Sequence, residues 1–524
     1  MLGFFLSKQK KGQSVTKLIS VFKWMIGWFK PNRNQISSFV LGGLAVTAFA
    51  PFEFSPIILL SLGGLFALWL GENTAKQSAK TGFWFGLGLF GFGTSWLFSS
   101  IYIYADVFLP IAIFLTLAFI IYLSLFTALA GWLAAKFRHK PLLAVILGFP
   151  AIWVLMELLR GSVFGGYPFL LSGNSHLHTW LDGYAPVFGV WGVSLAVAMS
   201  AGILVALLKY KQWLSASFLL GFVWLGGAGL QQIQWVQPAG DKVDVALMQG
   251  NIPQEEKWLA DKFIPTLKTY ITQTKLNLDA DVIVWPETAV PAYYSIVEKG
   301  ALHSFIKDVQ LLDKDVLLGV IDDKNDSDEY FNALINVGNP EDRYHKQHLV
   351  PFSEYFPFDD ALKFLTGLFD IPYATFSAGT EKGQVLNLGG QPAGVSICFE
   401  TAFGEELANR LPQAKYMVTV SNDAWFAYTF EPAQQLQDVQ MRALELGREF
   451  ARATNTGHTA IIGVDGRIKQ KIEPYEENVL RGKVQPYEGM TPYAQWQRLP
   501  IAFVLILIFA VLFLGLQRVK NRPE

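Results

Sequence analysis

The run LPIAFVLILIFAVLFLGL, residues 499–516, contains no charged side chain. A helix of about 20 mostly apolar residues can cross the hydrocarbon core of a bilayer, where no water satisfies open backbone groups. The whole 524-residue chain shares this character, since 52% of its residues are hydrophobic. The sequence therefore predicts a polytopic α-helical membrane protein that is long enough for a second domain.

Seven further candidate spans precede residue 236. They cover residues 37–50, 55–70, 82–103, 108–135, 141–159, 187–208 and 213–229. Between the seventh span and the run at 499–516 the chain has ordinary polarity, which predicts a soluble domain inserted into a membrane bundle. The expected division is a basic N-terminal segment (1–36), a seven-span bundle (37–235), a soluble domain (236–490), and an eighth span with a basic tail (491–524).

The distribution of basic residues predicts the orientation of these spans, because cytoplasmic loops are enriched in Lys and Arg. Arg160 is the only Lys or Arg in the loops after the first, third and fifth spans. The loops after the second, fourth and sixth spans hold Lys76, Lys80, Lys136, Arg138, Lys140, Lys209 and Lys211. Both basic termini fall on the same side as these seven. We therefore expect cytoplasmic termini and an outward-facing soluble domain.

Composition excludes several classes of site. A formal net charge of −1 offers no polyanion-binding surface, so we expect no nucleic-acid partner. The single cysteine, Cys398, can form neither an internal disulfide nor a multi-cysteine zinc site. His345 and His348 are three residues apart, but no third ligand is evident and no HExxH motif occurs. We expect no metal and no other cofactor.

Gly86, Gly88 and Gly91 satisfy a GxGxxG pattern, but no strand precedes them and the run lies in a predicted span. Close packing of helices through small residues explains these glycines better than a dinucleotide site.

The soluble domain alternates β-rich runs with helical stretches, which predicts an α/β layered fold with its chemistry at strand ends. The predicted strands lie in 242–250, 281–287, 315–321, 332–338, 393–400, 416–423 and 458–464. The predicted helices cover 255–279, 403–410 and 433–451.

Three of the strand ends stop on chemically useful residues: Glu287, Lys346 and Cys398. A free thiol is only a few per cent thiolate at neutral pH, so a nucleophilic cysteine needs a base or a nearby cation. A carboxylate and an ammonium can supply both, and the ammonium can also hold a developing oxyanion. The alternative for each residue alone is structural: a buried small hydrophobe, a solvated carboxylate and a surface lysine.

Several motifs carry a resemblance to known proteins. WPE at 285–287, a Lys before HLVPFSEYFP (348–357) and ICFE (397–400) resemble the nitrilase superfamily. MQGNIPQEEKW (248–258), SNDAWF (421–426), QMRALELGREFARATNTGHTAIIGVDGRI (440–468) and GMTPYAQW (489–496), with the flanking spans, resemble the apolipoprotein N-acyltransferase family. The resemblance implies a nitrilase-like αββα sandwich beside the membrane bundle.

The resemblance also implies roles for named residues. Glu287 falls on the family's base, Lys346 on its transition-state-stabilising lysine and Cys398 on its nucleophile. Further matches to the family's site are Glu354, Glu400, Asn332 and Trp258, and Phe399 stands where Tyr is common. Asn332 can equally be a turn residue at a strand end, and the lack of a hydroxyl at Phe399 puts in doubt any role that needs it.

The implied activity moves a fatty acyl group from a phospholipid, commonly phosphatidylethanolamine, to the N-terminal amine of a diacylglyceryl-cysteine on an apolipoprotein. The implied location is the bacterial inner membrane, with the catalytic domain in the periplasm, and we expect a monomer. As a hypothesis, Cys398 forms a thioester with Glu287 as base, and the amine then attacks it. Two alternatives stay open: a membrane-anchored nitrilase-type amidase, and a non-catalytic protein that binds lipid or peptide.

Two stretches of the soluble domain, 358–376 and 423–432, are unusually aromatic and apolar for loops. We predict that they form lids over an acyl-chain entrance. The residues expected to line this entrance are Phe364, Leu368, Phe369, Trp425, Phe426 and Phe430. Ordinary core packing is the alternative.

Overall fold

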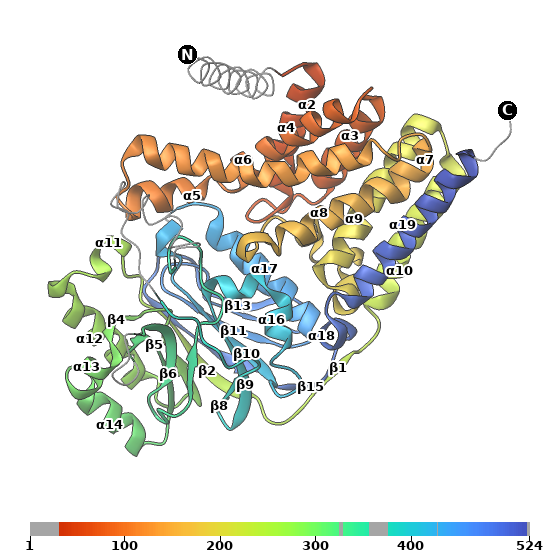
Figure 1. Ribbon diagram of the computed structural model, residues 1–524. Coiled ribbons are helices and arrows are strands. Elements are labelled where there is room, and N and C mark those ends of the chain that lie inside the picture. The colour runs from red at the N-terminus through yellow and green to blue at the C-terminus, as the bar shows by residue number, and fades with distance from the viewer. Residues whose placement is uncertain (1–30, 324–328, 356–375, 427, 521–524) are drawn as a thin grey trace, which may run out of the picture.

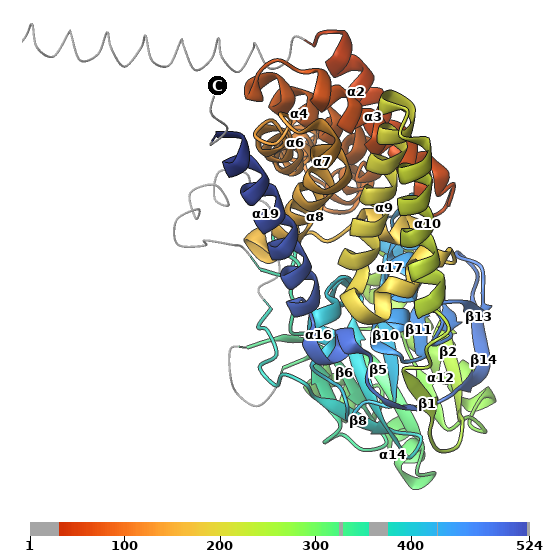
Figure 2. The ribbon, with the colours of Figure 1, turned by 90° about the vertical axis from the view of Figure 1, so that its right-hand side faces the viewer.

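The computed structural model describes residues 31–323, 329–355, 376–426 and 428–520, with side chains to Leu514. Figure 1 shows a helical bundle stacked on a sheet sandwich, with α17 (Glu431–Leu446) at the junction between them. The start of α2 (Arg33–Ala45) and the end of α19 (Leu499–Lys520) lie at the end of the bundle that points away from the sandwich (Figures 1 and 2).

Helices occupy all eight ranges predicted as spans. Besides α2 and α19 they are α3 (Pro56–Gly71), α4 (Ala75–Gly93), α5 (Trp96–Ser99) with η2 (Ser100–Tyr104), α6 (Leu109–Ala134), α7 (Pro141–Leu143) with η3 (Ala144–Gly148) and α8 (Phe149–Arg160), α9 (Ala185–Tyr210) and α10 (Trp213–Leu230). By length and composition four described helices can cross a membrane, or five if the pair bent by 52° at Gly93–Trp96 is one span. The number of eight spans stays a prediction.

Two of the three glycines in the GxGxxG run serve helix packing, as predicted. A Cβ on Gly88 of α4 would overlap the carbonyl oxygen of Phe39 in α2. A Cβ on Gly86 would overlap the Thr127 hydroxyl of α6. Gly91 has open space around it, so packing does not explain the third glycine.

Two sheets form the sandwich. The seven-stranded sheet has the order β14 (Asn478–Val484), β2 (Val243–Gln249), β3 (Val282–Val284), β5 (Asp315–Asp322), β6 (Phe331–Asn336) and β7 (Arg343–His345), and β4 (Val290–Tyr293) also pairs with β5. The six-stranded sheet has the order β13 (Ile468–Lys471), β12 (Ala460–Ile462), β11 (Phe450–Thr454), β10 (Tyr416–Ser421), β9 (Gln391–Ile397) and β8 (Val385–Leu388). A separate pair joins β1 (Val236–Pro238) to β15 (Tyr487–Gly489).

Successive side chains of a strand point to opposite faces of its sheet, and this alternation produces four layers. Val245 and Leu247 of β2 face the other sheet, where they meet Val418 of β10, whereas Ala246 and Met248 face outward. Burial of each Val or Leu side chain stabilises the fold by about 1.5–3 kcal/mol. The outer faces are covered by α12 (Ala260–Leu276), α13 (Tyr294–Lys299) and α14 (His303–Leu311) on one sheet, and by α16 (Gly404–Ala408), α17 and α18 (Pro492–Trp496) on the other. The layers are therefore αββα.

The helix predicted over 433–451 is wrong at its C-terminal end. Gly447 has a φ of 62°, a left-handed conformation that favours glycine and ends α17 at Leu446. Phe450 then begins β11, a buried strand in the middle of its sheet that the sequence analysis missed. The helix predicted over 255–279 is two helices, α11 (Gln254–Lys257) and α12.

Polar side chains of α17 bind the helical bundle directly, an arrangement that we call the α17 junction. The bonds are Trp96 Nε1 to Gln434 Oε1 (3.2 Å), Asn174 Nδ2 to Asp438 Oδ1 (2.5 Å) and the backbone N–H of Val190 to Glu445 Oε1 (2.6 Å). Buried donors and acceptors must be satisfied, so these bonds fix how the sandwich sits on the bundle.

Candidate functional site

Glu287, Lys346 and Cys398 follow three different strands. Glu287 comes shortly after β3, Lys346 directly follows β7, and Cys398 directly follows β9 of the facing sheet. Cys398 has a φ of 54°, a conformation that is strained for a residue with a side chain. Such strain costs about 1–3 kcal/mol and clusters at functional sites. It turns the chain sharply into η7 (Cys398–Ala402) and leaves Cys398 half-buried.

A buried network joins the polar partners of this site. The Lys346 ammonium, whose residue is 1% exposed, lies 2.9 Å from Glu354 and 3.5 Å from Glu287 Oε1. Asn332 Nδ2 donates to both carboxylates, at 2.8 Å to Glu287 and 3.0 Å to Glu354. The backbone N–H of Asn422 donates to the other oxygen of Glu287 at 2.8 Å. Lys346, Asn332 and the backbone of Asn422 therefore hold the Glu287 carboxylate in one orientation, and Glu354 binds the first two of these.

Electrostatics set opposite protonation states for Glu287 and Cys398. Burial alone would raise the pKa of Glu287, but the charge of Lys346 and the bond from Asn332 hold it below its usual value. Burial disfavours the charged form of Lys346 and by itself would lower its pKa. The negative charges of Glu354 and Glu287 outweigh this effect and raise the pKa, so Lys346 stays an ammonium. Burial and the charge of Glu287 raise the pKa of Cys398. The resting site thus holds a carboxylate, an ammonium and a protonated thiol.

Glu400 lies two residues beyond Cys398, and its carboxylate accepts hydrogen bonds from the Tyr344 hydroxyl and from backbone N–H groups. Its Oε1 accepts from the N–H groups of Gln347 (2.7 Å) and His348 (3.1 Å), and its Oε2 accepts from that of Ile397 (2.7 Å). Glu400 therefore ties the segment after Lys346 to the strand before Cys398. This geometry favours a positioning role over a chemical one.

The aromatic residues predicted around the site lie in different places. Trp258 is 55% exposed and lies outside the buried network. Phe399 stacks on Phe169 of the bundle, with ring centroids 6.0 Å apart and planes 9° apart. It also meets the His348 ring edge-on. The turn that carries Cys398 is thus packed against the bundle.

The loop 423–430 also packs on the bundle. Trp425 meets Tyr104 at 6.3 Å, Phe426 meets Trp96 at 5.0 Å, and Phe430 meets Phe52 at 5.2 Å, each edge to face. The lid role of these residues stays a prediction. The other predicted lid stretch, with Phe364, Leu368 and Phe369, lies almost entirely in residues 356–375, outside the described residues.

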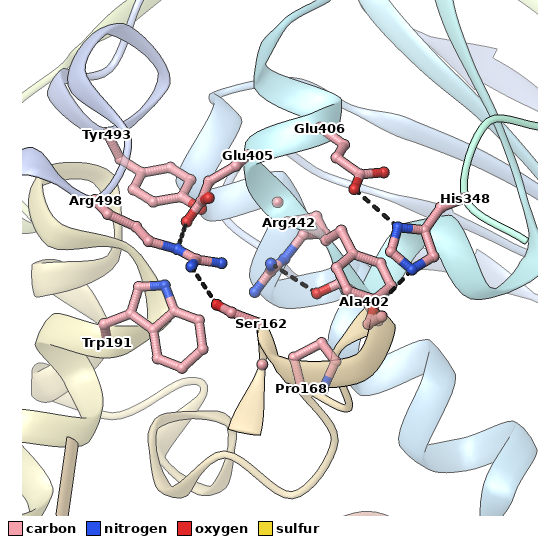
Figure 3. Close-up of a pocket in the computed structure, with 14 residues that line it drawn as sticks. Ser162, Pro168, Trp191, His348, Ala402, Glu405, Glu406, Arg442, Tyr493 and Arg498 are labelled. Carbon is pink, nitrogen blue, oxygen red and sulfur yellow. Dashed lines mark hydrogen bonds and ion pairs between the residues drawn. The ribbon is translucent and has the colours of Figure 1, made fainter. Parts of the chain in front are cut away.

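A cavity of about 240 Å³ lies beside the site, between the end of α8, α16 and α17 (Figure 3). Its charged groups bind one another or nearby backbone: Arg498 contacts Glu405 and Ser162, and His348 lies 2.8 Å from Glu406 and 3.0 Å from the carbonyl of Gly165. His345 instead binds Asp322 at 2.7 Å, so the two histidines do not converge on one point.

Comparison with known proteins covers both parts of the chain. The family model described as "Apolipoprotein N-acyltransferase N-terminal domain" matches residues 41–203, and the carbon-nitrogen hydrolase model matches residues 244–492. The apolipoprotein N-acyltransferase of Methylococcus capsulatus is 41% identical over 87% of this chain and 91% of its own length. The chain belongs to the apolipoprotein N-acyltransferase family of enzymes. The Nitrosomonas europaea member is 40% identical over 93% of this chain and 97% of its own length.

Sequence reasoning missed two side chains that contact the family's expected triad positions. Lys257, which is 4% exposed, donates to the backbone carbonyl of Glu287 at 3.2 Å, and its charge acts on Cys398. Gln435 Nε2 donates to Cys398 Sγ at 3.8 Å. The sequence signal for Lys257 was its place beside Trp258 in the matched EEKW motif. Gln435 gave no comparable signal.

Replacing Lys257 by methionine should slow acylation of Cys398 about 10-fold, a loss of about 1.4 kcal/mol, and stabilise the fold by about 1–3 kcal/mol at neutral pH. Burial lowers the pKa of Lys257 from 10.5 to about 8. Between about pH 8 and pH 10.5 Lys257 is protonated in the unfolded chain but neutral in the folded one, so the stability of wild type rises with pH in this range. Below about pH 8 the folded protein holds a buried charge, which costs stability. Denaturant unfolding and acylation rates check both signs.

Lys262→Met is the matched control, because Lys262 is a half-exposed lysine of α12 paired with Glu256. It should change neither quantity. A Lys257→Met variant that is less stable than wild type at neutral pH would contradict the prediction.

Proposed function

We propose that this protein transfers a fatty acyl group from a phospholipid to the N-terminal amine of a diacylglyceryl-cysteine on apolipoproteins. The observation that carries the proposal is the carboxylate and ammonium, Glu287 and Lys346, whose charges act on a lone thiol, while the next residue, Phe399, packs on Phe169 of the apolar bundle. The names of the curated relatives support the same activity. Phosphatidylethanolamine is the proposed donor.

In the first half-reaction Glu287 takes the proton of Cys398, and the thiolate attacks the ester carbonyl carbon of the phospholipid. The carbonyl oxygen becomes an oxyanion, and Lys346 supplies a fixed positive charge for it. As the intermediate collapses, the C–O bond breaks and Glu287 returns the proton to the leaving alkoxide. The products are a lysophospholipid and a thioester on Cys398.

In the second half-reaction the free amine of the acceptor attacks the thioester carbon. The C–N bond forms and the C–S bond breaks, while Glu287 passes a proton from the attacking nitrogen to the departing sulfur. Water competes for the thioester, so the site must be dry. The apolar contacts of Phe399 with Phe169 and of Phe426 with Trp96 support this requirement.

The proposed setting is the bacterial inner membrane, with eight spans, cytoplasmic termini, a periplasmic sandwich and a monomeric chain. The start of α2 and the end of α19 lie opposite the sandwich, which supports the proposed orientation (Figure 1). In a Cys398→Ser background, the variant Asp465→Cys places one thiol on an exposed loop of the sandwich. A membrane-impermeant maleimide should label it in intact spheroplasts, and labelling only after lysis would contradict the orientation.

Intact-mass analysis of the purified protein tests the activity itself. Incubation with phosphatidylethanolamine should add one acyl mass to the chain, and a diacylated lipopeptide with a free amine should remove it as a triacylated product. Loss of the adduct to water at the same rate, with or without the lipopeptide, would favour the amidase alternative. A chain that acquires no adduct would overturn the thioester route.

Phe426→Ser should slow phospholipid turnover about 10-fold, while the protein still folds and its unfolding midpoint falls only slightly. The edge-to-face contact with Trp96 is worth about 0.5–1.5 kcal/mol, and its loss admits water beside the acyl chain. Turnover of a fluorescent phospholipid measures the effect. Tyr428→Ser is the control, since this residue of the same loop is almost fully exposed. Equal rates for Phe426→Ser and wild type would discard the lid role.

A further inference from the structure

Glu431, at the start of α17, is a buried carboxyl that the proposed mechanism leaves unused. The residue is 1% exposed. Its Oε1 accepts a long hydrogen bond from Gln435 at 3.4 Å, and its Oε2 has no partner among the described residues. A buried oxygen without a partner destabilises the folded protein, so this one calls for an explanation.

The environment of Glu431 links it to the nucleophile. The same Gln435 Nε2 that donates to Glu431 also donates to Cys398 Sγ, so a single amide group separates carboxyl and thiol. Arg452, the cation whose charge acts on Glu431, is already engaged by Asp423 at 3.1 Å and by Gln435 Oε1 at 2.6 Å. Among the described residues, Arg452 makes no ion pair with Glu431. The carboxylate form of Glu431 is therefore not neutralised by direct contact with this arginine.

The bundle side of Glu431 offers a second unsatisfied group and an apolar approach. The Tyr167 hydroxyl is buried, has no partner in the described part of the chain, and interacts electrostatically with Glu431. The preceding residue, Phe430, packs on Phe52, which is 51% exposed. Phe430 thus connects Glu431 to an exposed apolar side chain of the bundle, which suits a ligand that joins a charged amine to lipid chains.

The second half-reaction needs a group of this kind. An N-terminal amine has a pKa of about 8, so the acceptor arrives mostly as an ammonium, which has no lone pair for attack. We propose that Glu431 binds the N-terminal ammonium of the acceptor and takes one proton from it, an inference that rests on the proposed acyl transfer.

The proton balance is as follows. When the ammonium enters, the Glu431 carboxylic acid releases its proton to solvent and pairs with the ammonium as a carboxylate. The ammonium then passes a proton to Oε2, which restores the carboxylic acid and leaves the free amine beside the thioester. A site shielded from water favours this neutral pair over the ion pair, because burial penalises charge. Burial, with the charge of Asp423, raises the pKa of Glu431, in keeping with this direction.

The two half-reactions separate this inference from the proposed function. Wild type and Glu431→Gln are loaded with acyl groups from phosphatidylethanolamine, and intact mass follows loading and discharge. We expect equal loading rates, discharge by a diacylated lipopeptide about 100-fold slower in the variant, and equal discharge by hydroxylamine, a nucleophile that is uncharged at neutral pH. Glu431→Asp keeps the carboxyl group and should be discharged by the lipopeptide faster than Glu431→Gln. If the glutamine variant folds poorly, the comparison of Glu431→Asp with wild type tests the inference instead.

Glu445→Gln is the matched control, because it removes another buried carboxylate of α17 that binds the backbone of Val190. It should not slow lipopeptide discharge selectively. Wild type without any thioester would overturn the proposed function and this inference together. Normal loading with equal lipopeptide discharge in wild type and Glu431→Gln would overturn the inference alone. Slower loading of Glu431→Gln, or hydroxylamine discharge slowed as much as lipopeptide discharge, would do the same. So would the same selective defect in Glu445→Gln.

Discussion

Replacing Cys398 by alanine should abolish acyl transfer and leave no acyl adduct on the chain. The proposed route passes every acyl group through this sulfur, so the loss should be at least about 10⁴-fold, larger than removal of a proton-transfer group alone. Mass analysis after incubation with phospholipid, together with a lipopeptide acylation assay, measures both effects.

The side chain of Cys398 is small and partly exposed, so its removal should leave the fold unchanged. Cys398→Ser tests the chemistry at nearly constant volume. Its hydroxyl is a weaker nucleophile than the thiol, and we expect a loss close to that of alanine, with any adduct now an ester resistant to hydroxylamine at neutral pH. Acyl transfer by Cys398→Ala at more than a trace rate would refute covalent catalysis at this position.

Lys346→Met should lower the acylation rate about 10³-fold and destabilise the fold by about 3–5 kcal/mol. The substitution leaves Glu287 and Glu354 as buried carboxylates without their shared cation. It also removes the charge that holds the pKa of Glu287 below its usual value. Acylation rates across pH and denaturant unfolding provide the measurements.

The pH dependence gives this prediction a sign. The depressed pKa of Glu287 contributes stability that is present above its unfolded value of 4.5 and is lost as pH falls through the folded value. In Lys346→Met the pKa of Glu287 rises, so the acid limbs of both stability and acylation should move to higher pH. Lys469→Met breaks an ion pair between a half-exposed lysine of β13 and buried Glu449, neither of which contacts the network around Glu287, and should cost some stability without changing the acylation profile. An unshifted acid limb in Lys346→Met would contradict the assigned coupling.

The position of the candidate site at strand ends was predictable from the sequence, but its place between two facing sheets was not. Glu287 and Cys398 each follow an apolar strand, and such ends gather side chains at one edge of a layered fold. The two strands belong to different sheets, however, and only the resemblance to a known family indicated that those sheets face each other. The bond that the backbone of Asn422 donates to Glu287 depends on this face-to-face packing, whereas Asn332 lies in the same sheet as the strand before Glu287.

The misses have local physical causes. The helical spacing of Leu436, Val439 and Ala443 extended the predicted helix into 447–451, because the left-handed turn at Gly447 leaves no mark in a periodicity. Lys257 and Glu431 were overlooked because charged residues are normally at the surface, and burial of either is set by tertiary packing alone. Residues of this kind, against the ordinary rule for their type, are where function is expected.

The α17 junction has a consequence for how the protein can be handled. Helix α17 contributes Leu436, Val439 and Ala443 to the sandwich while Gln434, Asp438 and Glu445 bind the bundle, so neither part is complete without the other. A truncated sandwich would expose these amides and carboxylates to solvent together with Phe399 and Phe426, and this surface would favour aggregation. The intact chain should melt in one cooperative transition, and inhibitor screens on the isolated soluble half would sample a surface that the enzyme never displays.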